Sequence, residues 1–200
     1  MITTIIFDIG NVLVDFCWEE YLNSFGFDDK VVKRIADATV LNDAWNEFDR
    51  GGSEEEELIE AFVRNDPDIE KEIRQICENI HDMLRKREYA IPWIKELKEM
   101  GYKVYYLSNF SKKAERECAH TIDFIPYMDG GILSYQVKMV KPNPEIYKLL
   151  IKRFRLTPEE CVFMDDRADN CCAAENLGIH AILFKTKEDA IEELKKLGVY

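Results

Sequence analysis

The sequence has little of what marks fibrous, disordered, membrane or nucleic-acid-binding proteins. It holds only nine glycines and six prolines in 200 residues, and 46% of its residues are hydrophobic, which excludes a fibrous or disordered chain. No apolar run approaches the roughly 18 residues of a membrane-spanning helix. Basic residues are outnumbered, 27 against 39 acidic ones, and the net charge of -12 disfavours nucleic acid and anionic membranes as partners.

Targeting and disulfide signals are also missing. The first residues lack the basic segment and the long apolar core of a signal peptide. The six cysteines show no CxxC or other metal-binding spacing, so we expect free thiols in a reducing compartment. These absences predict a cytoplasmic protein that keeps its N-terminus, and we expect it to be a monomer or a weak homodimer.

Short apolar segments that end in polar turns are typical of buried parallel strands. Four such segments occur, at residues 2–7, 102–107, 161–164 and 181–184. Helix starts lie between them at Pro92, at Asn143-Pro144 and at Thr157-Pro158, the last within a capping box. The alternation from about residue 88 onward predicts an α/β fold with a Rossmann-like, doubly wound parallel sheet and right-handed crossovers.

Residues 16–87 have a different pattern, with no convincing strand. Apolar side chains three and four residues apart predict one helix with a single buried stripe over residues 69–83. Ser53 and Glu56 are spaced as the capping box of another helix. We therefore predict that residues 16–87 are a small all-helical cap domain, inserted after the first strand of an α/β core domain that comprises residues 1–15 and 88–200.

Polar residues stand where the predicted strands end. Asp8 follows the first strand, Ser108-Asn109 the second and Asp165-Asp166 the third, and Lys141 precedes a helix start. The carboxyl ends of parallel strands meet at one edge of a sheet, where ligands bind. Carboxylates hold a hard cation, and a lysine with a hydroxyl binds phosphoryl oxygens. Any one of these residues would serve equally as a turn residue or a helix cap, but together they predict a Mg2+-assisted phosphoryl site.

Four segments contain these residues: Phe7-Asp8-Ile9-Gly10-Asn11-Val12-Leu13, Leu107-Ser108-Asn109, Lys141-Pro142-Asn143-Pro144-Glu145-Ile146-Tyr147 and Phe163-Met164-Asp165-Asp166-Arg167-Ala168-Asp169-Asn170. In this order they resemble the four motifs of the haloacid dehalogenase-like (HAD) hydrolase superfamily. The predicted helical cap lies where one subclass of that superfamily has it. The FDxGNV form of the first motif is similar to the branch that includes α-D-glucose-1-phosphate phosphatases.

The resemblance implies a phosphatase mechanism. Asp8 matches the catalytic nucleophile, which forms an aspartyl-phosphate that water then hydrolyses. Ser108 and Lys141 match the catalytic residues that bind the transferring phosphoryl group, and Asn109 is expected to help orient that group. We expect Lys141 also to hold Asp8 in its ionised form.

The resemblance further implies Mg2+ as the cofactor. The expected ligands are the Asp8 side chain, the backbone carbonyl of Gly10 and the Asp166 side chain, with Asp165 beside them as a ligand either directly or through water. The implied activity is hydrolysis of a small phosphorylated metabolite, and a sugar phosphate is favoured as the substrate.

Gly10 departs from the family pattern, because family phosphatases usually have a second aspartate there as general acid and base. Losing a positioned acid typically costs roughly 100- to 10,000-fold in rate. A hexose 1-phosphate suits such a site, since its anomeric leaving hydroxyl is more acidic than an ordinary alcohol. Asp15, a cap residue and a bound water are left as alternative sources of the proton.

Two other functions stay open. A 2-haloacid dehalogenase also lacks the second aspartate, although Asp165 and Asp166 would repel its carboxylate substrate without a cation. A catalytically weak HAD-fold module that binds phosphate or metal is the other alternative. The sequence does not decide whether four cap residues face the substrate or pack at a helix end: Trp45, Phe48, Asp49 and Arg50.

Overall fold

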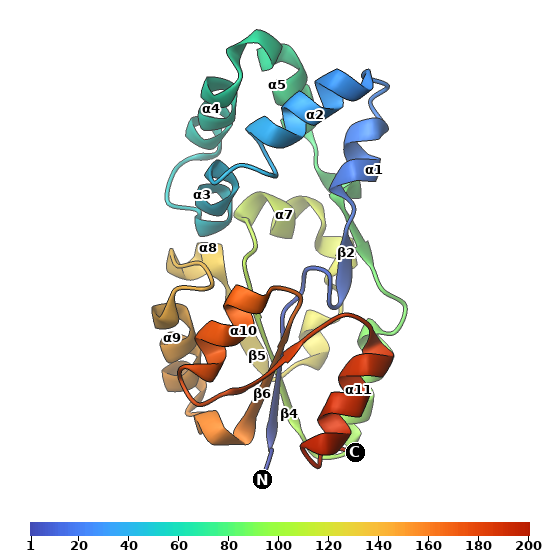
Figure 1. The fold of residues 1–200 in the computed structure, drawn as a ribbon, viewed down its shortest axis with the longest axis vertical. Helices are drawn as coiled ribbons and strands as arrows, with labels where there is room; N and C mark the ends of the chain where they lie inside the picture. Colours follow the sequence, from blue (N-terminus) through green and yellow to red (C-terminus); the bar gives the residue numbers. More distant parts are fainter.

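A five-stranded parallel sheet lies at the centre of the lower half of the molecule in Figure 1, and the computed structural model describes all 200 residues. The strand order is β5-β4-β1-β6-β7. The strands are β1 (Thr4–Phe7), β4 (Lys103–Ser108), β5 (Gly130–Leu133), β6 (Cys161–Asp165) and β7 (His180–Leu183). Four of these are the predicted strands, displaced by no more than two residues at either end.

Strand β5 was not predicted. Its four residues include two glycines and only two apolar side chains, so it carries almost no strand signal. A Cβ atom built on Gly131 would lie 2.3 Å from the Tyr106 ring of the neighbouring strand. The glycine is therefore needed for close approach of β5 to β4, which is a tertiary requirement.

Helices cover both faces of the sheet, as expected for a doubly wound fold. Ile5 and Phe7 of β1 pack with α6 (Ala90–Glu99) and α11 (Lys187–Lys196). Ile6, between them, packs on the opposite face with α9 (Pro144–Phe154) and α10 (Ala168–Glu175). In Figure 1, α9 and α10 accordingly lie on one side and α11 on the other. The predicted α/β class and the double winding are confirmed.

Five further helices form a separate layer above the carboxyl edge of the sheet (Figure 1). These cap helices are α1 (Trp18–Asn23), α2 (Asp29–Ala38), α3 (Ala44–Arg50), α4 (Glu55–Asn65) and α5 (Glu70–Glu78). They bury an apolar core of their own, which includes Leu22, Ile35, Phe62 and Ile73. No helix in the molecule combines the length and the apolar composition needed to cross a membrane.

Two predictions about the cap helices are wrong in detail. The predicted helix over residues 69–83 ends at Glu78, because Asn79 is extended and its side chain accepts a hydrogen bond from the His81 amide at 2.8 Å. Asparagine side chains often form such hydrogen bonds with nearby backbone amides, and these bonds compete with those that would continue the helix. Helix α4 is preceded by Glu54 as its N-cap, so Ser53 does not cap it.

A two-stranded antiparallel ribbon connects the sheet with the cap helices. It consists of β2 (Val14–Phe16) and β3 (Leu84–Lys86). The expectation of no strand within residues 16–87 is therefore wrong at both ends of that range. Strands of three residues are too short to show an alternating pattern, and two of the three residues of β3 are basic.

The remaining elements are short. Two helices, α7 (Lys112–Glu117) and α8 (Ser134–Val137), lie between the sheet and the cap helices (Figure 1). The capping box at Thr157 begins only a 3-10 turn, since β6 starts at Cys161. The 3-10 turns are Pro67–Ile69, His81–Met83, Ala119–Thr121, Ile125–Tyr127 and Pro158–Glu160.

Candidate active site

Three carboxylates lie together at the carboxyl edge of the sheet. Asp8 follows β1, Asp165 ends β6 and Asp166 is the next residue. One carboxylate oxygen from each lies within 4.8 Å of the others. Neighbouring parallel strands β1 and β6 end side by side, and this is why residues far apart in the sequence meet here.

Lys141 is buried between two of these acids. Its Nζ atom lies 2.9 Å from Asp8 Oδ1 and 2.6 Å from Asp165 Oδ2. The Asn109 side chain holds the backbone of Lys141 from both sides: Nδ2 donates to the Lys141 carbonyl at 3.0 Å, and Oδ1 accepts from the Lys141 amide at 2.7 Å. Asn109, which was predicted to orient phosphate, therefore positions the lysine, and its contact with phosphate stays a prediction.

The oxygens of Asp165 are occupied by donors from the protein. Oδ1 accepts hydrogen bonds from the Arg167 amide at 2.8 Å and from Asn170 Nδ2 at 2.9 Å, while Oδ2 faces Lys141. The structure thus shows Asp165 fixing the Lys141 ammonium. Its predicted role as a Mg2+ ligand, directly or through water, remains a prediction. The part played by Asn170 was missed, although it lies within the fourth motif.

Asp166 is oriented by a residue for which the sequence suggested no role. Asn11 Nδ2 donates to Asp166 Oδ2 at 2.9 Å, and Asn11 Oδ1 accepts from the Phe16 amide at 3.1 Å. Asn11 has a φ of 53°, a left-handed conformation that asparagine adopts more readily than most residues. The only available signal was its place in the turn directly after Gly10.

Burial dominates the electrostatics of the nucleophile. The pKa of Asp8 is raised to about 7, because burial and, to a lesser extent, the Asp165 charge raise it more than Lys141 and the Ser108 hydroxyl lower it. Lys141 acts on the pKa of Asp8 in the expected direction, but the effect of desolvation is larger, so the lysine does not hold this pKa at its ordinary value. Burial would lower the pKa of Lys141, but Asp8 and Asp165 raise it above its ordinary value, so the lysine is charged.

The donor set fits a divalent cation. Three carboxyl groups surround a single ammonium in this cluster, and carboxylate oxygens are the ligands that Mg2+ prefers. Asp8 and Asp166 both line the open side of the cluster, together with Gly10. These are the residues that would hold the ion.

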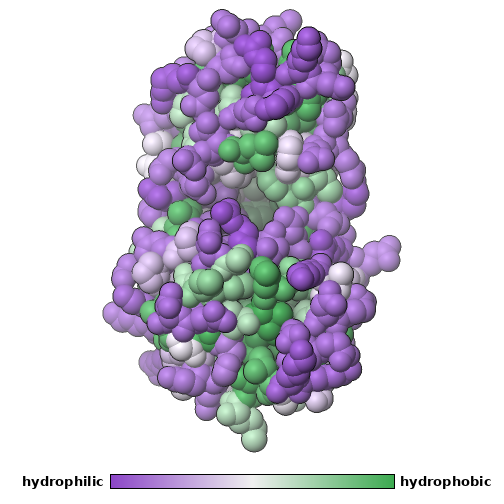
Figure 2. Space-filling model, viewed as in Figure 1, coloured by the Kyte–Doolittle hydropathy of each residue, from purple (hydrophilic) through white to green (hydrophobic).

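A chamber of about 250 Å³ separates this cluster from the cap helices. Figure 2 shows the hollow near the middle of the molecule, with hydrophobic surface inside it. Its lower wall is polar and contains Asp8, Asn109 and Lys141. Its remaining lining is largely apolar and includes Phe16, Val40, Trp45, Met83, Leu84 and Phe110.

The structure places the four cap residues whose orientation the sequence did not decide. Trp45 and Asp49 line the chamber. Phe48 is buried in the core of the cap helices, where its ring packs against Trp45 and Phe62. Arg50 pairs with Glu47 on its own helix at 2.8 Å. Only Trp45 and Asp49 are therefore placed to contact a substrate.

Comparison with known proteins identifies the family. A family model for haloacid dehalogenase-like hydrolases matches residues 2–178. The chain belongs to this family. The resemblance of the four motifs is thus confirmed at the level of the superfamily, and the protein is an enzyme of the HAD hydrolase type.

The relatives of this HAD hydrolase include phosphatases. The chain is 27% identical over 216 residues to D-ribitol-5-phosphate phosphatase from Bacteroides thetaiotaomicron, covering 97% of both proteins. It is 24% identical over 192 residues to sesquiterpene phosphatase astK from Aspergillus oryzae, covering 96% of this chain and 94% of that protein. Other curated relatives are much longer, and the chain spans 37% of one and 19% of another.

Solved structures share the fold along nearly the whole chain. One is the HAD family enzyme bt-2542 from Bacteroides thetaiotaomicron, in complex with magnesium and inorganic phosphate. Its TM-score with this HAD hydrolase is 0.71 at 25% sequence identity, covering 94% of this chain and 97% of that one.

Proposed function

We propose that this HAD hydrolase is a Mg2+-dependent phosphatase that hydrolyses a small phosphate monoester through an aspartyl-phosphate on Asp8. The observation that carries the proposal is the Lys141 ammonium 2.9 Å from Asp8 Oδ1, within a cluster of three carboxylates of which Asp8 and Asp166 line the chamber. The magnesium and phosphate held by the solved relative support the same chemistry.

Each residue has a defined task in this reaction. The Asp8 carboxylate attacks phosphorus, while Lys141 and Ser108 bind the phosphoryl oxygens. Asp165 and Asn109 keep Lys141 in place through the contacts described above. Asp8, Asp166 and the Gly10 carbonyl would hold Mg2+, with Asp165 either joining them directly or through water. The bound ion would neutralise phosphoryl charge.

Two substrate classes are supported by different observations. A hexose 1-phosphate, in line with the α-D-glucose-1-phosphate branch, is supported by the FDxGNV motif and by the missing acid at Gly10. A monoester with an apolar body is supported by the chamber, since Phe16, Trp45 and Met83 offer no hydrogen bonds to sugar hydroxyls except through the Trp45 indole. One phosphatase relative is named for the phosphate of a polar alcohol, ribitol, and the other for an apolar compound class, the sesquiterpenes.

A dehalogenase is the less favoured alternative. Asp166 lines the chamber beside Asp8, so an incoming carboxylate substrate would meet like charge. Chloride release from a 2-chloroacid in EDTA would establish that activity. If the protein binds phosphate but releases neither phosphate nor halide from any substrate, the alternative of a catalytically weak binding module is supported.

The test is phosphate release from a panel of monoesters, with Mg2+ and with EDTA. The panel pairs the 1- and 6-phosphates of the same hexoses, and adds straight-chain and isoprenyl alkyl monophosphates. We expect turnover that requires Mg2+. Preference for 1-phosphates supports the hexose assignment, preference for the alkyl esters supports the apolar one, and turnover undiminished by EDTA contradicts the metal dependence.

We predict that Asp8→Asn lowers phosphate release at least about a thousandfold, because the amide cannot serve as the nucleophile. The substitution keeps the shape of the side chain, so the melting temperature should stay within a few degrees of the wild-type value. Asp43→Asn is the matched control, since Asp43 is exposed and makes no capping hydrogen bond. Appreciable turnover in Asp8→Asn would remove Asp8 as the nucleophile.

A further inference from the structure

The chamber contains one carboxyl group that the proposed mechanism does not use. Its lining includes the side chains of Asp8, Asp166 and Asp49, and the first two already serve as nucleophile and metal ligand. Asp49 comes from cap helix α3, about forty residues along the chain from Gly10, where the family's usual acid is missing. It faces the same enclosed space as Asp8 and Lys141.

Helix α3 presents Asp49 to the chamber by its periodicity. Trp45, Asn46 and Asp49 all line the chamber. Asp49 lies four positions after Trp45 and three after Asn46, and residues with these spacings share one side of a helix. Phe48 points instead into the core of the cap helices, where it is buried. The packing of Phe48 in this core fixes the rotation of the helix.

The end of α3 that carries Asp49 is tied to the sheet domain. The buried Ser134 hydroxyl donates to the Asp49 carbonyl at 2.6 Å, and accepts from the Phe110 amide, next to Asn109, at 2.8 Å. Gly51, which ends α3 with a φ of 62°, packs so closely that a Cβ atom would lie 2.9 Å from Tyr135 Cβ. Lys138 also donates to the Gly51 carbonyl.

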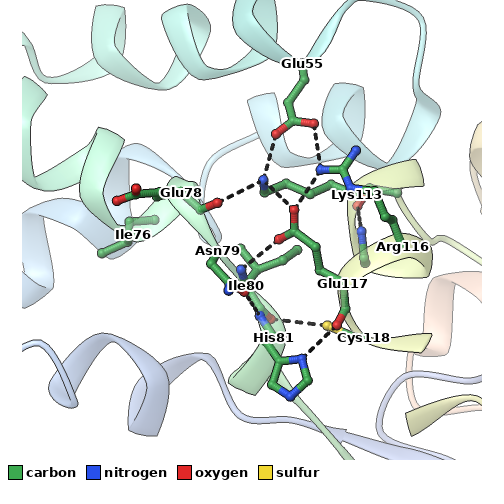
Figure 3. Close-up of polar contacts among 12 residues, drawn as sticks. Glu55, Ile76, Glu78, Asn79, Ile80, His81, Lys113, Arg116, Glu117 and Cys118 are labelled. Carbon is green, nitrogen blue, oxygen red and sulfur yellow. Dashed lines mark hydrogen bonds and ion pairs between the residues drawn. The ribbon is translucent and has the colours of Figure 1, made fainter. Parts of the chain in front are cut away.

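A second set of contacts holds the start of the next cap helix (Figure 3). Glu55 accepts from Lys113 at 2.6 Å and pairs with Arg116 at 3.1 Å, both on α7. Lys113 is 5% exposed and also pairs with Glu117 at 2.9 Å. Contacts to the sheet domain therefore hold the chain on both sides of the turn at Gly51, and they fix the end of α3 that carries Asp49.

We propose that Asp49 is the general acid and base that replaces the aspartate missing at Gly10, an inference that rests on the proposed phosphatase function. As Asp8 bonds to phosphorus, the bond from phosphorus to the ester oxygen breaks, and protonated Asp49 gives its proton to that oxygen, so the product leaves as a neutral alcohol. Ionised Asp49 then takes a proton from the water that attacks the aspartyl-phosphate. Phosphate is released, and Asp8 and protonated Asp49 are restored.

Two observations support this choice of residue. Burial and the Asp8 charge raise the pKa of Asp49 to about 7, against the effect of Lys141, so both protonation states are accessible near neutral pH. Asp15, the other carboxylate considered for this role, pairs with Arg87 at 2.8 Å and does not line the chamber.

The test compares Asp49→Asn with the wild type on two substrates. One is the best alkyl monoester from the panel, whose alcohol needs a proton to leave, and the other is 4-nitrophenyl phosphate, whose leaving group does not. The parameter is kcat/KM, which reports phosphorylation of Asp8 and excludes the later hydrolysis. We expect a loss of at least about 100-fold for the alkyl ester and less than about fivefold for the aryl ester.

A rescue experiment separates proton transfer from a structural role. A Cβ atom on Gly10 meets no atom within 4 Å, so the backbone leaves room for a side chain to start there. We expect Gly10→Asp to restore alkyl ester turnover at least tenfold in the Asp49→Asn background, while Asp43→Asn alone leaves both substrates unaffected.

The outcomes are distinct. Equal losses on the two substrates, or no loss on the alkyl ester, overturn the assignment of Asp49 while wild-type turnover still supports the phosphatase. Failure of Gly10→Asp to rescue a folded Asp49→Asn variant also counts against proton transfer. Absence of phosphate release by the wild type on every substrate overturns the proposed function, and this inference with it.

Discussion

The Asn11 side chain contacts both a backbone amide and a predicted metal ligand. Its left-handed φ of 53° turns the chain after Gly10, while its amide group fixes Asp166 and accepts from the Phe16 amide. Residues that orient a metal ligand commonly affect metal affinity more than they affect the fold. Asn11 is therefore a positioning residue for the proposed Mg2+ site.

We predict that Asn11→Gly raises the Mg2+ concentration needed for half-maximal activity by roughly tenfold. Glycine keeps the left-handed turn, so the change removes the amide without straining the backbone. Titration of activity against Mg2+ measures the effect, and saturating Mg2+ should recover most of the turnover. An unchanged Mg2+ requirement would show that Asp166 needs no orientation from Asn11.

At the level of elements, the contact between α7 and the cap helices is built around Glu117 (Figure 3). Its carboxylate accepts from the Ile80 amide at 2.9 Å and pairs with Lys113 at 2.9 Å and Arg116 at 2.7 Å. Burial alone would raise the pKa of Glu117, but these three donors outweigh it and lower the pKa below the ordinary value. A group with a lowered folded-state pKa contributes stability above its unfolded-state pKa, and this stability is lost as the pH falls through the folded value.

We predict that Glu117→Gln lowers the free energy of unfolding by roughly 2 kcal/mol at neutral pH, because it leaves buried Lys113 with a weaker partner. The difference from the wild type should shrink as the pH falls below about 4.3, where the unfolded-state glutamate is protonated. Urea unfolding of both proteins across this range is the measurement. Glu78→Gln is the control, since Glu78 is exposed. A difference that stays constant with pH would contradict the assignment.

The ribbon of β2 and β3 is the element that joins the cap helices to the sheet. Its two strands pair Val14 with Lys86 and Phe16 with Leu84. We propose that the cap domain, residues 16–87, and the core domain, residues 1–15 and 88–200, divide here. The separate apolar cores of the cap helices and of the sheet support this division.

For the whole molecule, the acidic cluster links metal binding to stability. Three carboxylates within 4.8 Å repel one another in the folded state, and this repulsion is relieved by a cation. We predict that Mg2+ at about 100 times its Kd stabilises the protein by about 2.7 kcal/mol, a rise in melting temperature of several degrees. Asp166→Asn should abolish most of this rise. Thermal melts with Mg2+ and with EDTA provide the comparison, and an equal rise in the variant would place the ion elsewhere.

We propose a small phosphorylated substrate as the partner of this protein, and neither nucleic acid nor a membrane. The net charge is -12. All six cysteines are free and five are buried, and the cytoplasmic location stays a prediction. The large exposed apolar side chains come from separate parts of the chain, including Leu41, Met100, Tyr127 and Leu183.

We accordingly predict a monomer or a weak homodimer, because these exposed side chains come from different elements. Sedimentation at micromolar concentration should give a mass near the 23.5 kDa of one chain. A dimer that persists on dilution to nanomolar concentration would contradict this expectation and would point to an interface on the exposed surface.

The sequence by itself determined four of the five strands of the sheet and the residues at its carboxyl edge. Strand β1 is a continuous apolar run that stops at Asp8, and β6 stops at Asp165 and Asp166, so the period and the end of each strand could be read locally. Parallel strands must then bring those ends to one edge. Lys141 could be placed there because it precedes the proline that begins α9.

Only the tertiary structure decided how these residues are held and what covers them. Asn109 holds the Lys141 backbone, and Asp165, which accepts a hydrogen bond from Asn170, fixes the Lys141 ammonium. No local sequence pattern encodes these pairings. Asp49 reaches the chamber only because Ser134 and the α7 ion pairs dock the cap on the sheet. Docking depends on how the apolar core of the cap helices packs against that of the sheet domain. The spacing of apolar residues in the sequence predicts strands and helices, but it does not tell how two such cores pack together.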